Sequence, residues 1–312
     1  MLNGIRIAGT GSELPERRMS NRAVAELSGR IDATWIEDNL GIRERRVADP
    51  NQCTSDLATK AALEALKNAE CDVQDVELLI VATATPDKLA PSTAAIVAER
   101  LCLARSVAFD IGAVCSGFLF ALVTAAQFVR TGHVRTALVI GADTFSRITD
   151  WTARDAGFFG DGAGAVVLQA SVSGDSLPND LRVVGGSQHF HVPAHARHFQ
   201  MDARAVGRSA AEHLPRSVAA TLGSAGLTPD DIDLVVPHQP SIRLLQRVAE
   251  GTGIPWERFH LTMDRYANTA AATIPITLHD ARLHQRVGRD TTIMFMSAGA
   301  GMSVGAAVYC WH

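Results

Sequence analysis

Three side chains in this sequence have types that could form a nucleophilic site: Cys115, His238 and Asn268. Cys115 stands in AVCSGF, where a strand-like stretch is followed by an apolar, helix-like one. Free N–H groups and the dipole at a helix start favour a thiolate and lower its pKa, so Cys115 is a candidate nucleophile. A buried structural cysteine is the alternative reading at this position. The other four cysteines, Cys53, Cys71, Cys102 and Cys310, are expected to be structural.

His238 and Asn268 carry the two further polar groups. His238 ends the apolar run DLVVPH between two prolines, so the strand must stop and present the imidazole in a turn, which is typical of a general base. A satisfied core histidine is the alternative. Asn268, in YANTAAATIP, begins a helix rich in small residues, and its amide can donate a hydrogen bond to a developing oxyanion. An ordinary N-cap is the alternative there.

A long internal repeat positions these residues. A helix-like stretch leads into an apolar strand twice, at 77–85 and at 233–239. Each passage continues into a strand, a sharp turn and a small-residue helix, and each closes with glycines and a strand. The spacing from Ile80 to Cys115 is 35 residues, and that from Val235 to Asn268 is 33. The repeat predicts two duplicated α/β halves.

The strands LLIVAT, TALVIGAD, DLVVPH and TTIMFMS are continuous apolar runs, as sheets covered on both faces require. The fold class expected is therefore α/β, a five-layer α/β/α/β/α sandwich. The helices that begin near Cys115 and Asn268 would share the central layer, with their N-termini facing each other. We expect one half over 1–170 carrying the nucleophile and a second half over 205–312 carrying the histidine and the asparagine. Residues 171–204 would connect the halves, as a surface loop or as a loop that lines a substrate tunnel.

Composition excludes several classes of protein. The 312 residues include 29 Lys and Arg against 33 Asp and Glu, and 47% are hydrophobic, so the chain is not disordered. This balance gives no electrostatic reason to expect nucleic acid or an anionic membrane as a partner. Five scattered cysteines without a C-x-x-C pair indicate neither a disulfide framework nor a thiolate zinc site. The cysteine pattern predicts a reducing compartment, and the sequence shows no typical secretory signal and no apolar run of spanning length.

Taken together, the segments AVCSGF, VPHQPS and YANTAAATIP follow the order and spacing of a known family. The chain resembles β-ketoacyl-ACP synthase III, of the thiolase superfamily, over nearly its whole length, including WIEDNLGIRERR (35–46), FGDGAGAVVL (159–168) and SAGAGMSVG (297–305). The resemblance implies that Cys115 is acylated by an acyl-CoA. His238 and Asn268 would then bind the carbonyl of a malonyl thioester as it decarboxylates, and the enolate would attack the acyl group. It also implies a homodimer in the cytoplasm, malonyl-CoA or an acyl carrier protein as partner, and no metal or organic cofactor.

The resemblance assigns further residues. It implies that the backbone N–H groups of Cys115 and Ala300 form an oxyanion hole. It implies CoA-binding roles for Trp35, Arg154, Arg43 and Arg243, and carrier-protein docking by Arg208.

Departures from the family pattern bear on the substrate. Asn39 stands where a basic residue is usual, and Glu250 and Gly251 replace a frequent basic pair. Ala90 and Ala298 occupy acyl-pocket positions where housekeeping members commonly carry phenylalanine, Ala90 in a segment that would enter the partner subunit's pocket. Asn39 puts one CoA phosphate contact in doubt and Glu250–Gly251 weakens the carrier-docking patch, whereas the two alanines predict a bulkier acyl group or a larger second substrate.

Other functions stay open at this stage. Transfer of the acyl group from Cys115 to an alcohol or amine would use His238 as a base, and Asn268 argues for decarboxylation instead. A catalytically silent subunit or scaffold is expected to lose the nucleophile, and a thiolase proper needs a second cysteine within 299–301, where the sequence is GAG. Cysteine hydrolases share only the three residue types.

Two other motifs predict no separate site. The histidines His189, His191, His195 and His198 have a spacing that could suit a metal, but without an acidic or thiolate ligand set we expect a loop lining the tunnel. The segment GDGAGA lacks the strand–turn–helix context of a nucleotide site, so close backbone packing explains its glycines better.

Overall fold

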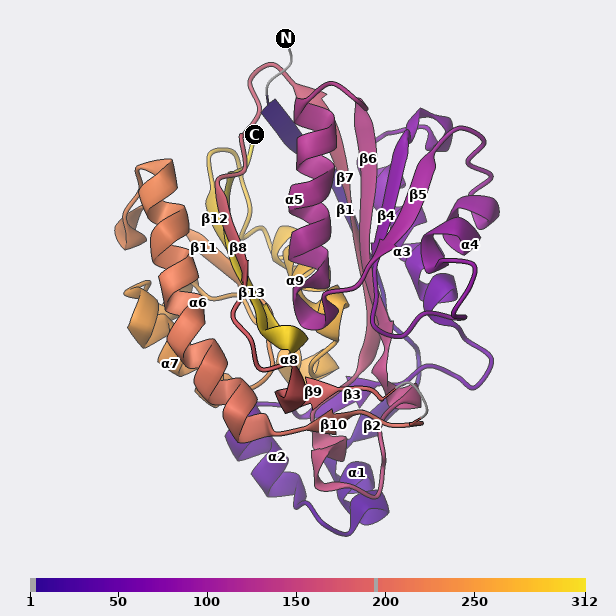
Figure 1. The fold of residues 1–312 in the computed structure, drawn as a ribbon, viewed down its shortest axis with the longest axis vertical. Coiled ribbons are helices and arrows are strands. Elements are labelled where there is room, and N and C mark those ends of the chain that lie inside the picture. Colours follow the sequence, from indigo (N-terminus) through magenta and orange to yellow (C-terminus); the bar gives the residue numbers. More distant parts are fainter. Residues whose placement is uncertain (1–3, 194–195) are drawn as a thin grey trace.

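The computed structural model describes residues 4–193 and 196–312, and its framework is two sheets (Figure 1). The first has the order β1-β7-β6-β4-β5 and the second the order β11-β12-β13-β8. The strands of the first are β1 (Gly4–Glu13), β4 (Leu78–Ala82), β5 (Val107–Ile111), β6 (Thr136–Thr144) and β7 (Asp161–Ser171). Those of the second are β8 (Asn179–Val183), β11 (Leu234–Pro237), β12 (Thr292–Gly299) and β13 (Ser303–Cys310). Each sheet mixes parallel and antiparallel pairs.

Helices cover both faces of each sheet, which makes five layers (Figure 1). The outer helices are α3 (Thr54–Asn68) and α4 (Thr93–Arg100) on the first sheet, with α6 (Ala203–Ala225) and α7 (Ile242–Thr252) on the second. The central helices α5 (Gly117–Arg130) and α9 (Thr273–Leu283) share one core with both sheets. Every residue of β4 and β6 is buried, as the continuous apolar runs predict. The predicted five-layer α/β sandwich is confirmed.

The two central helices begin close together. A Cβ built on Gly117, the first residue of α5, would lie 3.7 Å from the Cβ of Ala271, in the turn just before α9. Neither helix start has a side-chain cap. The N-terminal ends therefore converge on one region between the sheets, and Cys115 and Asn268 lie just upstream of them.

The remaining elements gather at one end of the molecule (Figure 1). They are α1 (Asn21–Ser28), α2 (Ala33–Leu40) and the strand pair β2 (Arg18–Ser20) and β3 (Glu44–Arg46), together with the pair β9 (Phe190–His191) and β10 (Gln200–Met201) and the short helix α8 (Met263–Tyr266). The segment 171–204 thus supplies β9, β10 and also β8, the outer strand of the second sheet. None of the helices in the described part of the chain is long and apolar enough to cross a membrane.

Candidate active site

Cys115 lies in a tight 3₁₀ turn, Val114–Ser116, between β5 and α5. The turn is held from the second sheet, because the Ser116 hydroxyl donates to the carbonyl of Ser303 at 2.9 Å. Val114 has a φ of 46°, a left-handed conformation that β-branched residues rarely adopt. The backbone beside Cys115 is therefore strained, and strain of this kind persists where the surrounding structure enforces it.

The environment of the Cys115 thiol differs from the expectation. Its pKa is raised, mainly by burial and further by the negative charge of Asp143, whereas the helix-start argument predicts a lowered value. The reason is geometric: α5 begins at Gly117, beyond the cysteine, and the pocket removes water from the sulfur. The resting nucleophile is a neutral thiol, and its proton must leave during the reaction.

His238 follows β11 directly and is almost completely buried. Its backbone N–H donates to the carbonyl of Met296 at 2.8 Å, which continues the pairing with β12, and its Nδ1 atom has no hydrogen-bond partner. Burial lowers the pKa of His238 to about 3, and the backbone of Ala270 opposes this only in part. The imidazole is therefore neutral near pH 7, where it is a weak base but can donate one hydrogen bond.

Asn268 is fixed on both its backbone and its side chain. Its N–H donates to the carbonyl of Phe158 at 3.1 Å, and its own carbonyl accepts from Gly160 at 3.0 Å. The side-chain oxygen accepts from the Ala270 N–H at 2.9 Å, which leaves the amide nitrogen as the group available to donate. Ala267 and Ala270, on either side, have φ values of 59° and 48°. The asparagine turn is thus strained in the same way as the cysteine turn.

One pocket brings the predicted residues together. Cys115, His238 and Asn268 line it with Ala298 and Ala300, and it encloses about 660 Å³, part of it open to solvent. The three predicted residues therefore face one shared cavity.

Two parts of the pocket wall have different characters. One wall is a face of α6 bearing Ala203, Val206, Gly207 and Ala210, and the other is aromatic, with Phe158, Phe159 and Phe190. The aromatic wall is rigidly packed behind its surface: Phe145 stacks on Phe159 with ring centroids 4.4 Å apart, and Phe190 stacks on Phe199. The segment 171–204 contributes Phe190 and Met201 to the lining.

Gly299 holds Ala300 beside the nucleophile. A Cβ at position 299 would lie 2.7 Å from the Ser116 nitrogen and 2.8 Å from the Ala113 oxygen, so only glycine lets the two backbones approach this closely. The predicted oxyanion pair, the N–H groups of Cys115 and Ala300, therefore belongs to two backbone segments in direct contact.

The residues assigned to CoA lie on elements next to the pocket. The guanidinium of Arg154 sits over the ring of Trp35, 5.5 Å from its centroid. Gly41, at the end of α2, packs against Ile242 of α7, which brings these helices together.

The other basic candidates are exposed. Arg43 lies just after α2 and forms an ion pair with Glu37 at 3.2 Å, so its charge is shared. Arg243 on α7 and Arg208 on α6 are both exposed, and neither belongs to the pocket lining. Ala90 lies on an exposed loop, away from the pocket of its own chain.

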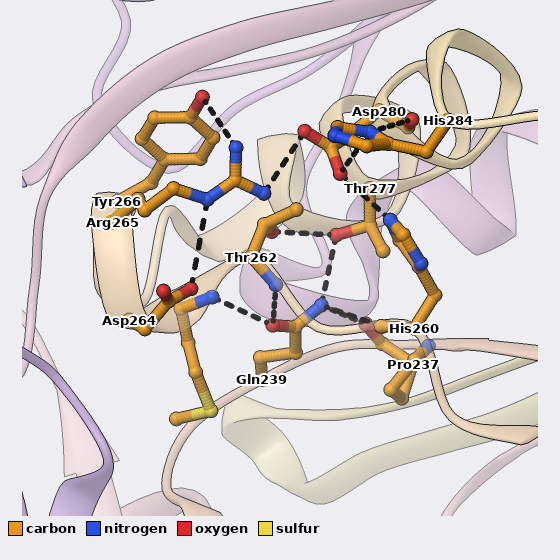
Figure 2. Close-up of polar contacts among 11 residues, drawn as sticks. Pro237, Gln239, His260, Thr262, Asp264, Arg265, Tyr266, Thr277, Asp280 and His284 are labelled. Carbon is orange, nitrogen blue, oxygen red and sulfur yellow. Dashed lines mark hydrogen bonds and ion pairs between the residues drawn. The ribbon is translucent and has the colours of Figure 1, made fainter. Parts of the chain in front are cut away.

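The histidine segment does not assemble a metal-type cluster in the part of the chain that the structure describes. His189 is half-buried, His191 and His198 are exposed, and His195 lies outside the described residues. Ligand-type atoms do approach one another elsewhere, in His260, Asp280 and His284, within 4.8 Å. Each of these already has a hydrogen-bond or ion-pair partner, so they form a closed polar network (Figure 2).

Two buried polar residues near the site escape sequence reasoning, Asp143 and Gln239. The Asp143 carboxylate accepts from the backbone N–H groups of Ala84 at 2.8 Å and Ala271 at 2.9 Å, and from two threonine hydroxyls. Burial raises its pKa to about 6, despite those donors. A charged residue that ends the continuous apolar run TALVIGAD is the signal that could have revealed it.

Comparison with known proteins gives consistent matches. The model of the family described as 3-oxoacyl-[acyl-carrier-protein (ACP)] synthase III matches residues 109–183, and that of its C-terminal part matches 222–311. A β-ketoacyl-[acyl-carrier-protein] synthase III from Laribacter hongkongensis is 41% identical, covering 97% of this chain and 98% of the relative.

Solved structures agree. The 3-oxoacyl-[acyl-carrier-protein] synthase III of Aquifex aeolicus VF5 superposes with a TM-score of 0.95 at 35% identity, covering 99% of this chain and 100% of the other. The priming β-ketosynthase of the R1128 polyketide biosynthetic pathway superposes with a TM-score of 0.94 at 28% identity, covering 99% and 96%.

Proposed function

Because the chain belongs to the 3-oxoacyl-[acyl-carrier-protein] synthase III family of condensing acyltransferases, we propose that Cys115 accepts an acyl group from an acyl-CoA and joins it to a decarboxylated malonyl thioester. The observation that carries this proposal is the meeting, in one pocket, of a cysteine with two neutral hydrogen-bond donors, His238 and Asn268. Two neutral donors suit an enolate oxygen, the group that forms when a malonyl thioester loses CO₂.

In the first half-reaction the Cys115 sulfur attacks the acyl-CoA carbonyl. The new C–S bond forms as the bond to the CoA sulfur breaks, and the thiol proton ends on that sulfur. The backbone N–H groups of Cys115 and Ala300 would stabilise the intermediate oxyanion. The raised pKa of Cys115 fits a nucleophile that becomes reactive only when substrate replaces water in the pocket.

In the second half-reaction the C–C bond to the malonyl carboxylate breaks and CO₂ departs. The electron pair passes to the thioester oxygen, where His238 and Asn268 donate to the enolate. The enolate carbon then attacks the acyl carbonyl, the C–S bond to Cys115 breaks, and the sulfur takes up a proton. Cys115, His238, Asn268 and two backbone N–H groups supply all these contacts, so the proposal requires no metal or organic cofactor.

Acyl transfer to an alcohol or amine is the second candidate, and the electrostatics of His238 count against it. Such a transfer needs a base for the acceptor, and an imidazole whose pKa is lowered to about 3 is a poor one. Donation of a hydrogen bond by the neutral ring needs no protonation change.

We propose further that the acyl substrate is larger than acetyl. Ala298 lines the pocket, and Gly207, which also lines it, has nothing within 4 Å of an added Cβ, so both positions leave space open. Ala90 would add further space only to the acyl pocket of a partner subunit.

A homodimer is part of the proposal. Support comes from β5, the outer strand of the first sheet, where Val107 is 50% exposed, and from the loop before α4, where Leu89 is fully exposed. An unpaired strand edge with apolar side chains is a surface that a second copy can cover. The unpaired cysteines agree with action in the reducing cytoplasm, with acyl-CoA, and malonyl-CoA or an acyl carrier protein, as partners.

A panel of acyl-CoAs tests both the donor and the pocket width. Intact-protein mass spectrometry should show an acyl adduct on the wild type and none on Cys115→Ala, with chains longer than acetyl loading fastest. Ala298→Phe should narrow the pocket and shift the preference towards acetyl. A wild type that loads acetyl-CoA far faster than every longer chain contradicts the proposed width, and one that loads no acyl-CoA contradicts the function.

A further inference from the structure

The side chain of Gln239 is completely buried and follows His238 in the chain. It forms three short hydrogen bonds (Figure 2). Its oxygen accepts from the backbone N–H groups of Thr262 at 2.9 Å and Met263 at 3.0 Å, and its nitrogen donates to the Thr277 hydroxyl at 2.8 Å. Both ends of the amide are therefore used, with no freedom to rotate without losing bonds.

These partners lie on both sides of Asn268. Thr262 and Met263 open the short helix α8, which precedes the asparagine turn, and Thr277 lies in α9, which follows it. The two sides are also joined directly, because the hydroxyls of Thr262 and Thr277 are 2.9 Å apart. The Gln239 amide thus connects the residue that follows His238 to the segments immediately before and after the Asn268 turn.

An outer layer of charged groups closes the same gap nearer the surface (Figure 2). Asp280 of α9 binds Arg265 of α8 at 3.0 Å and His260 at 2.7 Å. This layer bridges α8 and α9, but it makes no contact with Gln239 through its side chains. The backbone N–H of His260 also reaches the histidine strand, donating to the Val235 carbonyl of β11 at 3.0 Å, whereas Gln239 makes its link at the residue adjacent to His238.

The positions of two donors matter because both must reach one oxygen atom. The Asn268 side chain accepts one hydrogen bond, from the Ala270 N–H, and the Nδ1 atom of His238 has no partner, so neither side chain belongs to an extended hydrogen-bond network of its own. We infer that Gln239 is a positioning residue: with Thr262 and Thr277 it sets the separation between the His238 imidazole and the Asn268 amide. The inference rests on the proposed function, in which these two groups hold the enolate.

The structure predicts an effect on one half-reaction only. Cys115 and its turn are anchored by Ser303 and by the Gly299 contact, neither of which involves Gln239. Loss of the amide should therefore leave acylation of Cys115 intact and slow decarboxylation. Misplacement of a reacting group by about 1 Å can cost on the order of 100-fold in rate.

The experiment measures both half-reactions in the full-length wild type and in four full-length variants. Gln239→Ala removes the amide, Thr277→Val removes the hydroxyl at nearly constant shape, and Thr277→Ser restores a hydroxyl. Acylation is followed by the mass of the Cys115 adduct, and decarboxylation by CO₂ released from malonyl thioester by the acylated enzyme. Thr221→Val is the control for stability alone, since the buried hydroxyl of Thr221 on α6 donates to the Ala306 carbonyl of β13, outside this network.

We expect decarboxylation to fall about 10- to 100-fold in Gln239→Ala and less in Thr277→Val, at a nearly unchanged KM for the malonyl thioester. Acylation should stay within about twofold, and Thr277→Ser and Thr221→Val should match the wild type in both steps. If Gln239→Ala slows both half-reactions equally, the positioning role is overturned. The same holds if Thr221→Val, at a similar fall in Tm, slows decarboxylation as much as Gln239→Ala does. Failure of the wild type itself to release CO₂ contradicts the proposed function instead.

Discussion

For a single residue such as Asn268, catalysis depends on which side-chain atom faces the pocket. Its oxygen is occupied by the Ala270 N–H, so the amide nitrogen is the donor. Asn268→Ala should slow decarboxylation about 100- to 1,000-fold, since removal of one oxyanion donor costs about 2.7–4 kcal/mol of transition-state stabilisation. Assay of CO₂ release by acylated enzyme gives the number. Unchanged CO₂ release, with acylation intact, would assign Asn268 to structure alone.

Asp143 governs the reactivity of the nucleophile from a distance. Its charge helps raise the pKa of Cys115, and with its own pKa of about 6 it is ionised throughout the range where a thiol titrates. Removing the charge in Asp143→Asn should therefore lower the Cys115 pKa. The midpoint of the pH profile for Cys115 alkylation by iodoacetamide should move to lower pH.

The same substitution places an amide opposite the Ala271 N–H and should also reduce stability by about 1–3 kcal/mol. Urea unfolding checks that the variant is folded before alkylation is compared. An unchanged or higher alkylation midpoint in folded Asp143→Asn would show that burial alone sets the thiol pKa.

At the scale of elements, two glycines in the pocket lining make a matched pair. Gly299→Ala would drive a methyl group into the backbone of Ser116 and Ala113, whereas Gly207→Ala enters open space. We expect Gly299→Ala to displace the oxyanion segment and slow Cys115 acylation at least 10-fold, and Gly207→Ala to acylate normally. The acylation rates of both variants are measured by quenching the reaction at intervals and determining the mass of the acylated protein. Equal rates in the two variants would contradict the close approach.

The sequence predicts the elements well and the contacts between them poorly. Continuous apolar runs and the internal repeat were enough to predict the layered sheets and helices, since these elements follow from local sequence patterns. The turn residues Cys115, His238 and Asn268 were found because strand ends and helix starts are visible in a sequence. The raised pKa of the Cys115 thiol could not be predicted in this way, because it depends on burial and on Asp143, which lies 28 residues further along the chain.

The Gln239 network was missed for the same physical reason. Its partners lie at 262, 263 and 277, and only the folded arrangement of β11, α8 and α9 brings them together. The CoA candidates show an intermediate case. Family resemblance gave Trp35 and Arg154, and the structure places the guanidinium over the ring, but neither residue type reveals a ligand by itself.

At the scale of the whole molecule, the proposed homodimer makes a separate prediction. Val107 on the edge strand β5 is 50% exposed and Val183 on the opposite edge strand β8 is 72% exposed. A lysine on an edge opposes strand pairing, so Val107→Lys should yield a species near the chain mass of 33.3 kDa, while Val183→Lys stays dimeric. Light scattering after size-exclusion chromatography distinguishes them. A dimer that survives Val107→Lys and dissociates in Val183→Lys would move the interface to the second sheet.

The proposed reaction requires that two neutral hydrogen-bond donors and an acylated cysteine meet in one pocket, where a carbon–carbon bond forms. The most direct measurement is a single turnover of acyl-Cys115 enzyme with malonyl thioester, in which loss of the acyl mass and release of CO₂ are counted together. We predict one CO₂ per acyl group lost and a product longer by two carbons. Loss of the acyl group to an alcohol or amine with no CO₂ released would contradict the account.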